Sequence, residues 1–158
     1  MRHTISILVE NKPGVLTRVT SLFARRGFNI DSLAVGETED PKLSRITVVT
    51  GVDSAPLDQI MKQVYKLVNV IKVLNLKNDE SISTELALFK IVCPPEKRPE
   101  VFSTVNVFNA SVVDVTNNTV MVEATGSADK LASLEDIFRG YGIKEMARTG
   151  IIALGRGE

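Results

Sequence analysis

The feature that most constrains the fold is a change in hydrophobic period that recurs along the chain in a fixed order. Apolar residues alternate over residues 4–10, which predicts a strand, and then follow helical spacing from Pro13 to Arg26. Two further strands, a second helical stripe and a fourth strand follow, and the last strand ends at Leu76. This order is typical of two helices packed on one face of a four-stranded antiparallel sheet.

The same order recurs in the second half of the chain. We expect a first domain over residues 1–77, a polar linker over 78–84 and a second domain over 85–158. The predicted strands of the second domain cover residues 86–92, 111–116 and 120–125 and continue from Ile143, and its predicted helices cover 94–109 and 131–138. The expected fold class is α+β, with two ferredoxin-like βαββαβ domains and antiparallel sheets.

Two local signals refine the first unit. Gly27 follows two arginines at the end of the first helical stripe, where glycine suits the left-handed position after a helix. Ile30 and the later pair Leu33 and Val35 fall on opposite parities, which predicts a β-bulge near Asp31–Ser32. Two helices leave the other sheet face open, and domains of about 75 residues need to bury it, so we expect homodimerisation or packing against another subunit.

Composition excludes several classes of function. Nineteen basic residues balance nineteen acidic ones, so no net field favours nucleic acid or an anionic membrane. No apolar run reaches the roughly 20 residues of a membrane span, and no signal peptide is evident, so we expect a cytoplasmic protein. The single cysteine, Cys93, rules out a cysteine-based zinc cluster within one chain, and nothing near the single histidine, His3, supports a nucleophilic site. We therefore expect no catalytic and no metal-binding residues.

The start of the first helix reads NKPGVL, and such a start can bind a small anion. Its first N–H groups are unpaired, and Gly14 has no side chain to keep a ligand away from them. Asn11 and Asn29 each offer an amide donor and an acceptor, which suit a carboxylate and an ammonium. The apolar wall of this amino-acid site would come from Val15, Leu16 and Ile30. From the residues alone, a Pro-Gly turn without a ligand stays the simpler interpretation.

Longer stretches resemble one family along nearly the whole chain. NKPGVLTRVTSLFARRGFNIDSLAVGETED, LSRITVV, TELALFKI, ASVVDV, VMVEATGSADKL and YGIKEMARTGIIALGRG are similar, in this order, to blocks of the small, regulatory subunit of acetolactate synthase, also called acetohydroxyacid synthase. The resemblance implies an N-terminal ACT domain, which senses an amino acid, and a second ferredoxin-like domain. Two departures lie in the second half: Thr84-Glu85 replaces a common Arg-Glu, and the helix over 94–109 contains valine and serine where the family is usually richer in Glu, Arg and Leu.

The resemblance also implies a function. Such a subunit has no catalytic activity of its own: it activates a separate large subunit and confers feedback inhibition by valine in branched-chain amino-acid biosynthesis. Thiamine diphosphate, Mg and FAD would belong to that large subunit. By resemblance, valine lies between two ACT domains of a homodimer. One chain would contribute Asn11, Lys12, Pro13, Gly14, Val15 and Leu16, and the other Asn29 and Ile30.

Other interpretations stay open beside this one. The strongest is an ACT-type sensor that regulates a different enzyme or a transcription factor. An acylphosphatase-like hydrolase would need an Arg–Asn pair, and Arg18 and Asn29 are present without a recognisable phosphate loop. A purely structural dimer module would respond to no branched-chain amino acid. The sequence does not distinguish valine from leucine or isoleucine as the effector, and it does not identify the surface that contacts a large subunit.

Overall fold

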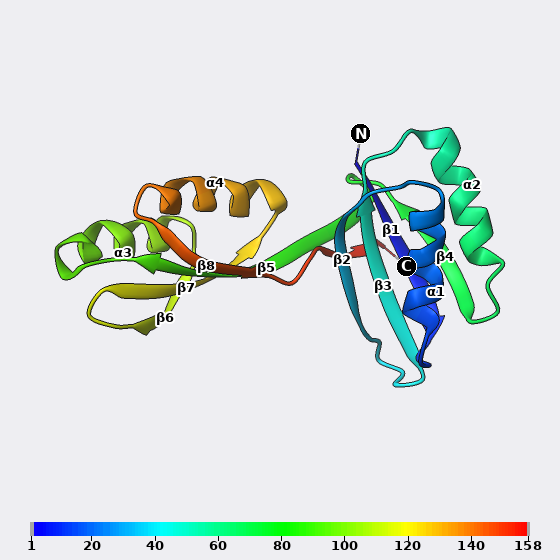
Figure 1. Ribbon diagram of the computed structural model, residues 1–158, viewed down its shortest axis with the longest axis horizontal. Helices are drawn as coiled ribbons and strands as arrows, with labels where there is room; N and C mark the ends of the chain where they lie inside the picture. Colours follow the sequence, from blue (N-terminus) through cyan, green and yellow to red (C-terminus); the bar gives the residue numbers. More distant parts are fainter. Residues whose placement is uncertain (1, 158) are drawn as a thin grey trace. The chain divides into compact units, whose positions relative to one another are not determined.

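The structure, a computed structural model, describes residues 2–157 and confirms the predicted fold class (Figure 1). The chain forms two compact units: residues 2–83 with 151–157 make the first, and residues 84–150 make the second. Within the described part of the chain, no helix is long and apolar enough to cross a membrane.

The first unit follows the predicted order. Its elements are β1 (His3–Glu10), α1 (Val15–Arg25), β2 (Ile30–Glu37), β3 (Leu43–Thr50), α2 (Ser54–Tyr65) and β4 (Val70–Leu76). The antiparallel sheet has the strand order β2-β3-β1-β4, so β2 and β4 are its edges. Both helices cover one face of this sheet (Figure 1). The core between the helices and the sheet includes Ile5, Ile7, Val19, Phe23, Ile46 and Ile60, all at most 1% exposed.

Both local signals of the first unit are confirmed. Gly27 has a φ of +73°, and beyond it the Phe28 N–H donates to the carbonyl of Phe23 at 2.9 Å, which closes the end of α1. The pairing of β2 with β3 shifts register between Ile30 and Ser32, which is the expected bulge. Asp31 is the extra residue of the bulge, so Ile30 lies beside Thr50 whereas Ser32 lies beside Val49, the adjacent residue of β3.

The second unit repeats the architecture of the first. Its elements are β5 (Ser81–Val92), a 3-10 turn (Pro95–Lys97), α3 (Arg98–Val107), β6 (Ser111–Val115), β7 (Thr119–Gly126), α4 (Ala128–Arg139) and β8 (Ile143–Arg148). The strand order β6-β7-β5-β8 is that of the first sheet, strand for strand. An edge-to-face pair, Phe89 and Phe138 with ring centroids 5.4 Å apart, joins the sheet to α4.

The structure differs from the expected domain boundaries at two points. Strand β5 begins at Ser81, so part of the expected linker over 78–84 is already a strand. A short strand, β9 (Ile152–Gly155), follows β8 and pairs with β5, and it groups with the first unit although the second domain was expected to extend to residue 158. The last strand belongs to the first unit because non-local hydrogen bonds hold it there. One of them runs from the Arg156 N–H to the Glu80 carbonyl at 2.7 Å.

The end of the chain covers part of the helix-free face of the first sheet. Ser32, Val49, Thr4 and Leu76 form one row across that face. The Ile151 N–H donates to Ser32 Oγ at 2.8 Å at one end of the row. At the other end, a Cβ on Gly155 would lie 3.8 Å from Leu76 Cδ2. The face that was expected to need a second subunit is thus covered in part by the chain itself.

Candidate functional site

Helix α1 begins without a side-chain cap. Gly14 occupies the N-cap position with φ +82° and ψ −8°, a left-handed conformation that favours glycine. Gly14 has no side chain to cap the helix, none of the described side chains caps the first turn in its place, and the first turn contains no acidic residue. Residues 11–14 are exposed. The Val15 N–H donates to the Lys12 carbonyl at 3.4 Å. The N–H groups of Leu16 and Thr17, and the partial positive charge of the helix start, are open to an anionic ligand.

Asn11 fixes this helix start against the far end of β2. Its Nδ2 donates to the Pro41 carbonyl at 3.0 Å and to Glu37 Oε1 at 3.3 Å. The Asn11 backbone N–H also donates to the Lys42 carbonyl at 2.7 Å. Gly14 and Glu37 therefore belong to the same end of the first unit.

Two cations lie near the helix start. Lys12 Nζ pairs with Glu10 Oε2 at 2.7 Å, and this hydrogen bond holds the pKa of the Glu10 carboxyl below its usual value. Arg18 donates to Asn69 Oδ1, and its Nη2 lies 4.0 Å from the position of a Cβ on Gly14. We did not assign Arg18 to the amino-acid site from the sequence. Arg18 follows Gly14 by four residues, about one helical turn, and this spacing could have predicted that its side chain lies beside Gly14.

Ile30 is the first residue of β2, and Asn29 immediately precedes it. Asn29 is exposed, its Nδ2 donates to Asp31 Oδ1 at 2.9 Å, and its carbonyl accepts from Thr50 Oγ1 at 2.7 Å. Ile30 is half-buried and packs against the core of the first unit. The Asn29 amide is thus held by Asp31 at the surface.

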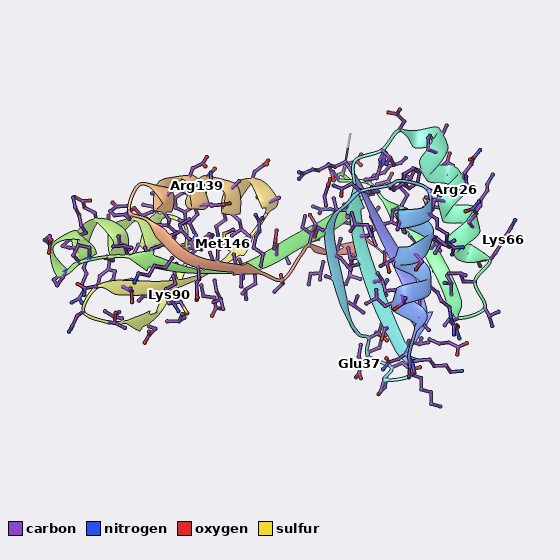
Figure 2. The ribbon with its side chains drawn as sticks, in the orientation of Figure 1. Arg26, Glu37, Lys66, Lys90, Arg139 and Met146 are labelled. Carbon is purple, nitrogen blue, oxygen red and sulfur yellow. The ribbon has the colours of Figure 1, made fainter. Side chains whose placement is uncertain are left out.

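One chain does not bring Asn29 to Gly14. The 11 residues of α1 separate them, which at 1.5 Å per residue is about 16 Å. Figure 2 agrees: Arg26, at the end of α1, and Glu37, beside its start, lie at opposite ends of the first unit. A site that uses both asparagines therefore needs two chains.

The apolar residues of the predicted wall differ in their exposure. The Val15 side chain is 3% exposed and belongs to the core, so only its backbone can meet a ligand. Leu16 is 37% exposed. Of these two neighbours, Leu16 is the one whose side chain a ligand can reach.

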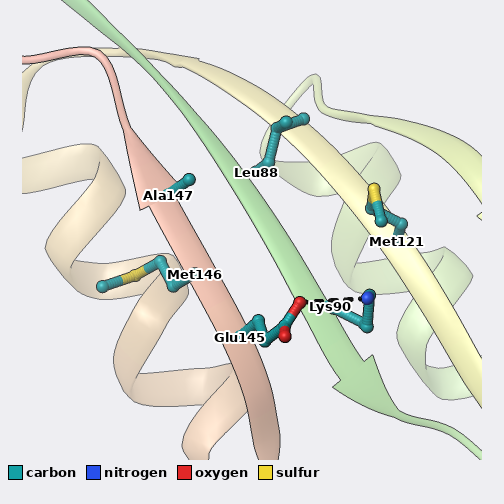
Figure 3. Close-up of a pocket in the computed structure, with 6 residues that line it drawn as sticks. All are labelled: Leu88, Lys90, Met121, Glu145, Met146 and Ala147. Carbon is teal, nitrogen blue, oxygen red and sulfur yellow. Dashed lines mark hydrogen bonds and ion pairs between the residues drawn. The ribbon is translucent and has the colours of Figure 1, made fainter.

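The second unit contains a shallow pocket on the helix-free face of its sheet. The lining residues are Leu88, Lys90, Met121, Glu145, Met146 and Ala147 (Figure 3). Lys90 Nζ and Glu145 Oε2 pair across it at 3.0 Å, so these two charges satisfy each other. None of the residues predicted to bind an amino acid lines this pocket.

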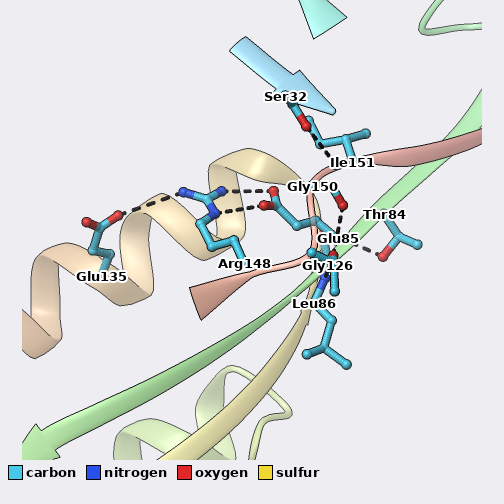
Figure 4. Close-up of polar contacts among 10 residues, drawn as sticks. Ser32, Thr84, Glu85, Leu86, Gly126, Glu135, Arg148, Gly150 and Ile151 are labelled. Atoms are coloured by element: carbon cyan, nitrogen blue, oxygen red, sulfur yellow. Dashed lines mark hydrogen bonds and ion pairs between the residues drawn. The ribbon is translucent and has the colours of Figure 1, made fainter. Parts of the chain in front are cut away.

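A bidentate ion pair lies at the other end of the second unit. Arg148 donates from Nε and Nη2 to the two carboxylate oxygens of Glu85 at 2.8 and 2.9 Å, and its Nη1 lies 4.0 Å from Glu135 (Figure 4). The hydrogen bond to Glu85 raises the pKa of Arg148. Glu85 is 5% exposed, so the pair fixes β5 to β8 rather than serving a ligand.

The order of helices and strands in the first unit is that of an ACT domain. Residues 5–72 match the AHAS small subunit-like ACT domain, and residues 84–157 match the small subunit of acetolactate synthase. With these two matches covering most of the sequence, the chain belongs to the acetolactate synthase small-subunit family.

Individual relatives agree with this assignment over the full length of the chain. The chain is 50% identical over 155 residues to the acetolactate synthase small subunit of Mycolicibacterium smegmatis, covering 98% of this chain and 91% of that protein. It is also 50% identical over 157 residues to the probable acetolactate synthase small subunit of Archaeoglobus fulgidus, covering 99% and 98%. The crystal structure of the acetolactate synthase small subunit from Thermotoga maritima matches with a TM-score of 0.92 at 40% identity, covering 100% of this chain and 99% of that one.

Proposed function

We propose that this chain is the regulatory subunit of acetolactate synthase in the cytoplasm. It binds the large catalytic subunit, raises its activity and makes it sensitive to feedback inhibition by valine. It has no catalytic activity of its own, and thiamine diphosphate, Mg and FAD belong to the large subunit. The observation that carries the proposal is an uncapped, exposed helix start in a domain that matches the ACT domain of this family.

Valine has the chemistry that this helix start can recognise. Its carboxylate would accept hydrogen bonds from the first N–H groups of α1, close to the Arg18 guanidinium. Its ammonium would donate to an asparagine side-chain oxygen. Its isopropyl group would pack against Leu16 of one chain and Ile30 of the other.

The topology of the first unit supports a homodimer that completes this site. Strand β2 is an edge strand, so it can pair with the same strand of a second copy across a twofold axis. Antiparallel pairing would bring Ile30 of the partner subunit beside Glu37 of the first chain. Glu37 contacts Asn11, so Asn29 of the partner subunit would lie beside the open helix start. Leu16, Leu33 and Val35, which are 37, 36 and 46% exposed, would be buried in such a dimer.

Valine that bridges two chains would favour one arrangement of this dimer over others. The large subunit would be held productively by an arrangement that valine disfavours. A ligand shifts such an equilibrium only by its difference in affinity for the two states, and couplings of about 1–3 kcal/mol are typical. A coupling of this size changes the equilibrium constant between the two arrangements about 5- to 150-fold.

The test is reconstitution with the large subunit. We expect the chain to increase acetolactate formation by the large subunit, and we expect valine to reverse most of that increase. Large subunit alone, with and without valine, is the control. Valine binding without any stimulation would instead support a sensor for another enzyme or for a transcription factor. Absence of both effects would contradict the proposed function.

A further inference from the structure

The C-terminal segment, residues 151–157, is part of the first unit and contacts β2 close to its start at Ile30, which Asn29 immediately precedes. Its first residue, Ile151, donates its N–H to Ser32 Oγ at 2.8 Å (Figure 4). Ser32 lies two residues after Ile30, on the far side of the bulge. The bulge puts Ser32 in register with Val49, on the helix-free face, where the segment lies. One local distortion therefore positions both Ile30 and the hydroxyl that holds the segment.

The segment is held mainly by backbone hydrogen bonds and buries little apolar surface. Its four-residue strand β9 pairs with β5, and the Arg156 N–H donates to the Glu80 carbonyl at 2.7 Å. Ile152 and Leu154 are 55 and 60% exposed. Ala153 is 4% exposed and is the anchor of the strand. Elements with little buried apolar surface open at a small fraction of the global unfolding free energy. The segment is thus suited to dock and to release while the rest of the first unit stays folded.

The segment begins directly after a fixed point of the second unit. Thr149 donates its N–H to the Leu86 carbonyl at 3.0 Å, and its Oγ1 accepts from the Leu86 N–H at 3.1 Å. Gly150 is the only residue between Thr149 and Ile151.

We propose that Ser32 is a positioning residue that couples effector binding at Asn29 and Ile30 to docking of the C-terminal segment. This inference rests on the proposed function. An effector that contacts Asn29 and Ile30 orders the start of β2, and this favours the bulge conformation in which Ser32 accepts the Ile151 N–H. By reciprocity, docking of the segment raises affinity for the effector by the same factor.

The test without ligand is hydrogen exchange of the full chain, followed by mass spectrometry of the peptide over residues 151–157. Loss of one hydrogen bond in Ser32→Ala is expected to speed exchange in this peptide roughly fivefold. Ser32→Thr keeps the hydroxyl and is expected to exchange like the wild type. Ser83→Ala, which alters an exposed serine of β5, is the matched control. Equal exchange in Ser32→Ala and the wild type would show that the Ser32 hydroxyl does not hold the C-terminal segment, and would overturn the proposal.

The coupling itself is tested with valine. Valine is expected to slow exchange of the 151–157 peptide in the wild type and not in Ser32→Ala. With the large subunit, Ser32→Ala is expected to need several-fold more valine for half-inhibition, with unchanged activity in the absence of valine. Full valine protection of the peptide in Ser32→Ala would overturn the coupling. If the wild-type chain binds no valine in calorimetry, the proposed function fails. The comparison of Ser32→Ala with the wild type without valine would still test whether Ser32 holds the C-terminal segment.

Discussion

Gly14→Asp is expected to abolish the valine response while leaving activation of the large subunit intact. The new carboxylate would stand at the helix start, where it repels the carboxylate of valine and accepts the same N–H groups. A Cβ at this position meets no atom closer than 4.0 Å, so lack of space is not the cause. We expect calorimetry to show at least about a 100-fold loss of valine affinity, or about 2.8 kcal/mol.

The matched control for this variant is Gly14→Asn. Gly14 has a φ of +82°, which costs about 1–2 kcal/mol for most L-residues and less for asparagine and aspartate. Asparagine has the shape of aspartate without its charge, so the two variants share the backbone strain and differ in electrostatics. Valine binding should be weakened much less by asparagine. Normal valine binding to Gly14→Asp would show that this helix start is not the effector site.

Arg148→Met is expected to destabilise the second unit by about 3 kcal/mol. The substitution leaves the carboxylate of Glu85, which is 5% exposed, buried without its cation. Removing one partner of a buried ion pair typically costs about 3–5 kcal/mol, and the partial exposure of Arg148 places the expected value at the low end. Urea unfolding, followed by hydrogen exchange of peptides within residues 84–150, assigns the loss to the correct unit.

Two further variants isolate the cause of this loss. The double variant Glu85→Gln/Arg148→Met removes both charges and should recover a large part of the lost stability. Lys90→Met breaks the exposed pair with Glu145, whose side chains are 37 and 74% exposed, and should cost less than about 1 kcal/mol. An equal loss in Lys90→Met and Arg148→Met would contradict the role of burial.

Local patterns predicted most of the fold of each unit. The change of period near Pro13, the glycine after the first helix and the change of parity after Ile30 each depend on neighbouring residues, and each is confirmed. The stripe of Val15, Val19 and Phe23 also reads as core, so the burial of Val15 could have been predicted. Strand β9 could not, because its apolar residues indicate a strand without indicating which sheet it joins.

The candidate site was predictable only in part, because some of its contacts join residues that are far apart in the sequence. The Pro-Gly helix start and its asparagines are visible in the sequence, whereas the position of Arg18 depends on the direction of a long side chain toward Asn69. The pairing of Asn11 with Glu37 depends on the register of two strands, and it is this contact that indicates which end of β2 a partner subunit would use.

Valine is proposed to bind between two chains, and a mixed dimer distinguishes this arrangement from a site within one chain. One chain carries Gly14→Asp and the other Asn29→Ala, with different tags so that the heterodimer can be purified. In a site shared between chains, one of the two sites receives both substitutions and the other receives neither. We therefore predict that calorimetry will show one valine per heterodimer, at wild-type affinity, and none for either homodimeric variant. No binding to the heterodimer would contradict a site shared between chains, because it would place Gly14 and Asn29 in a site within one chain.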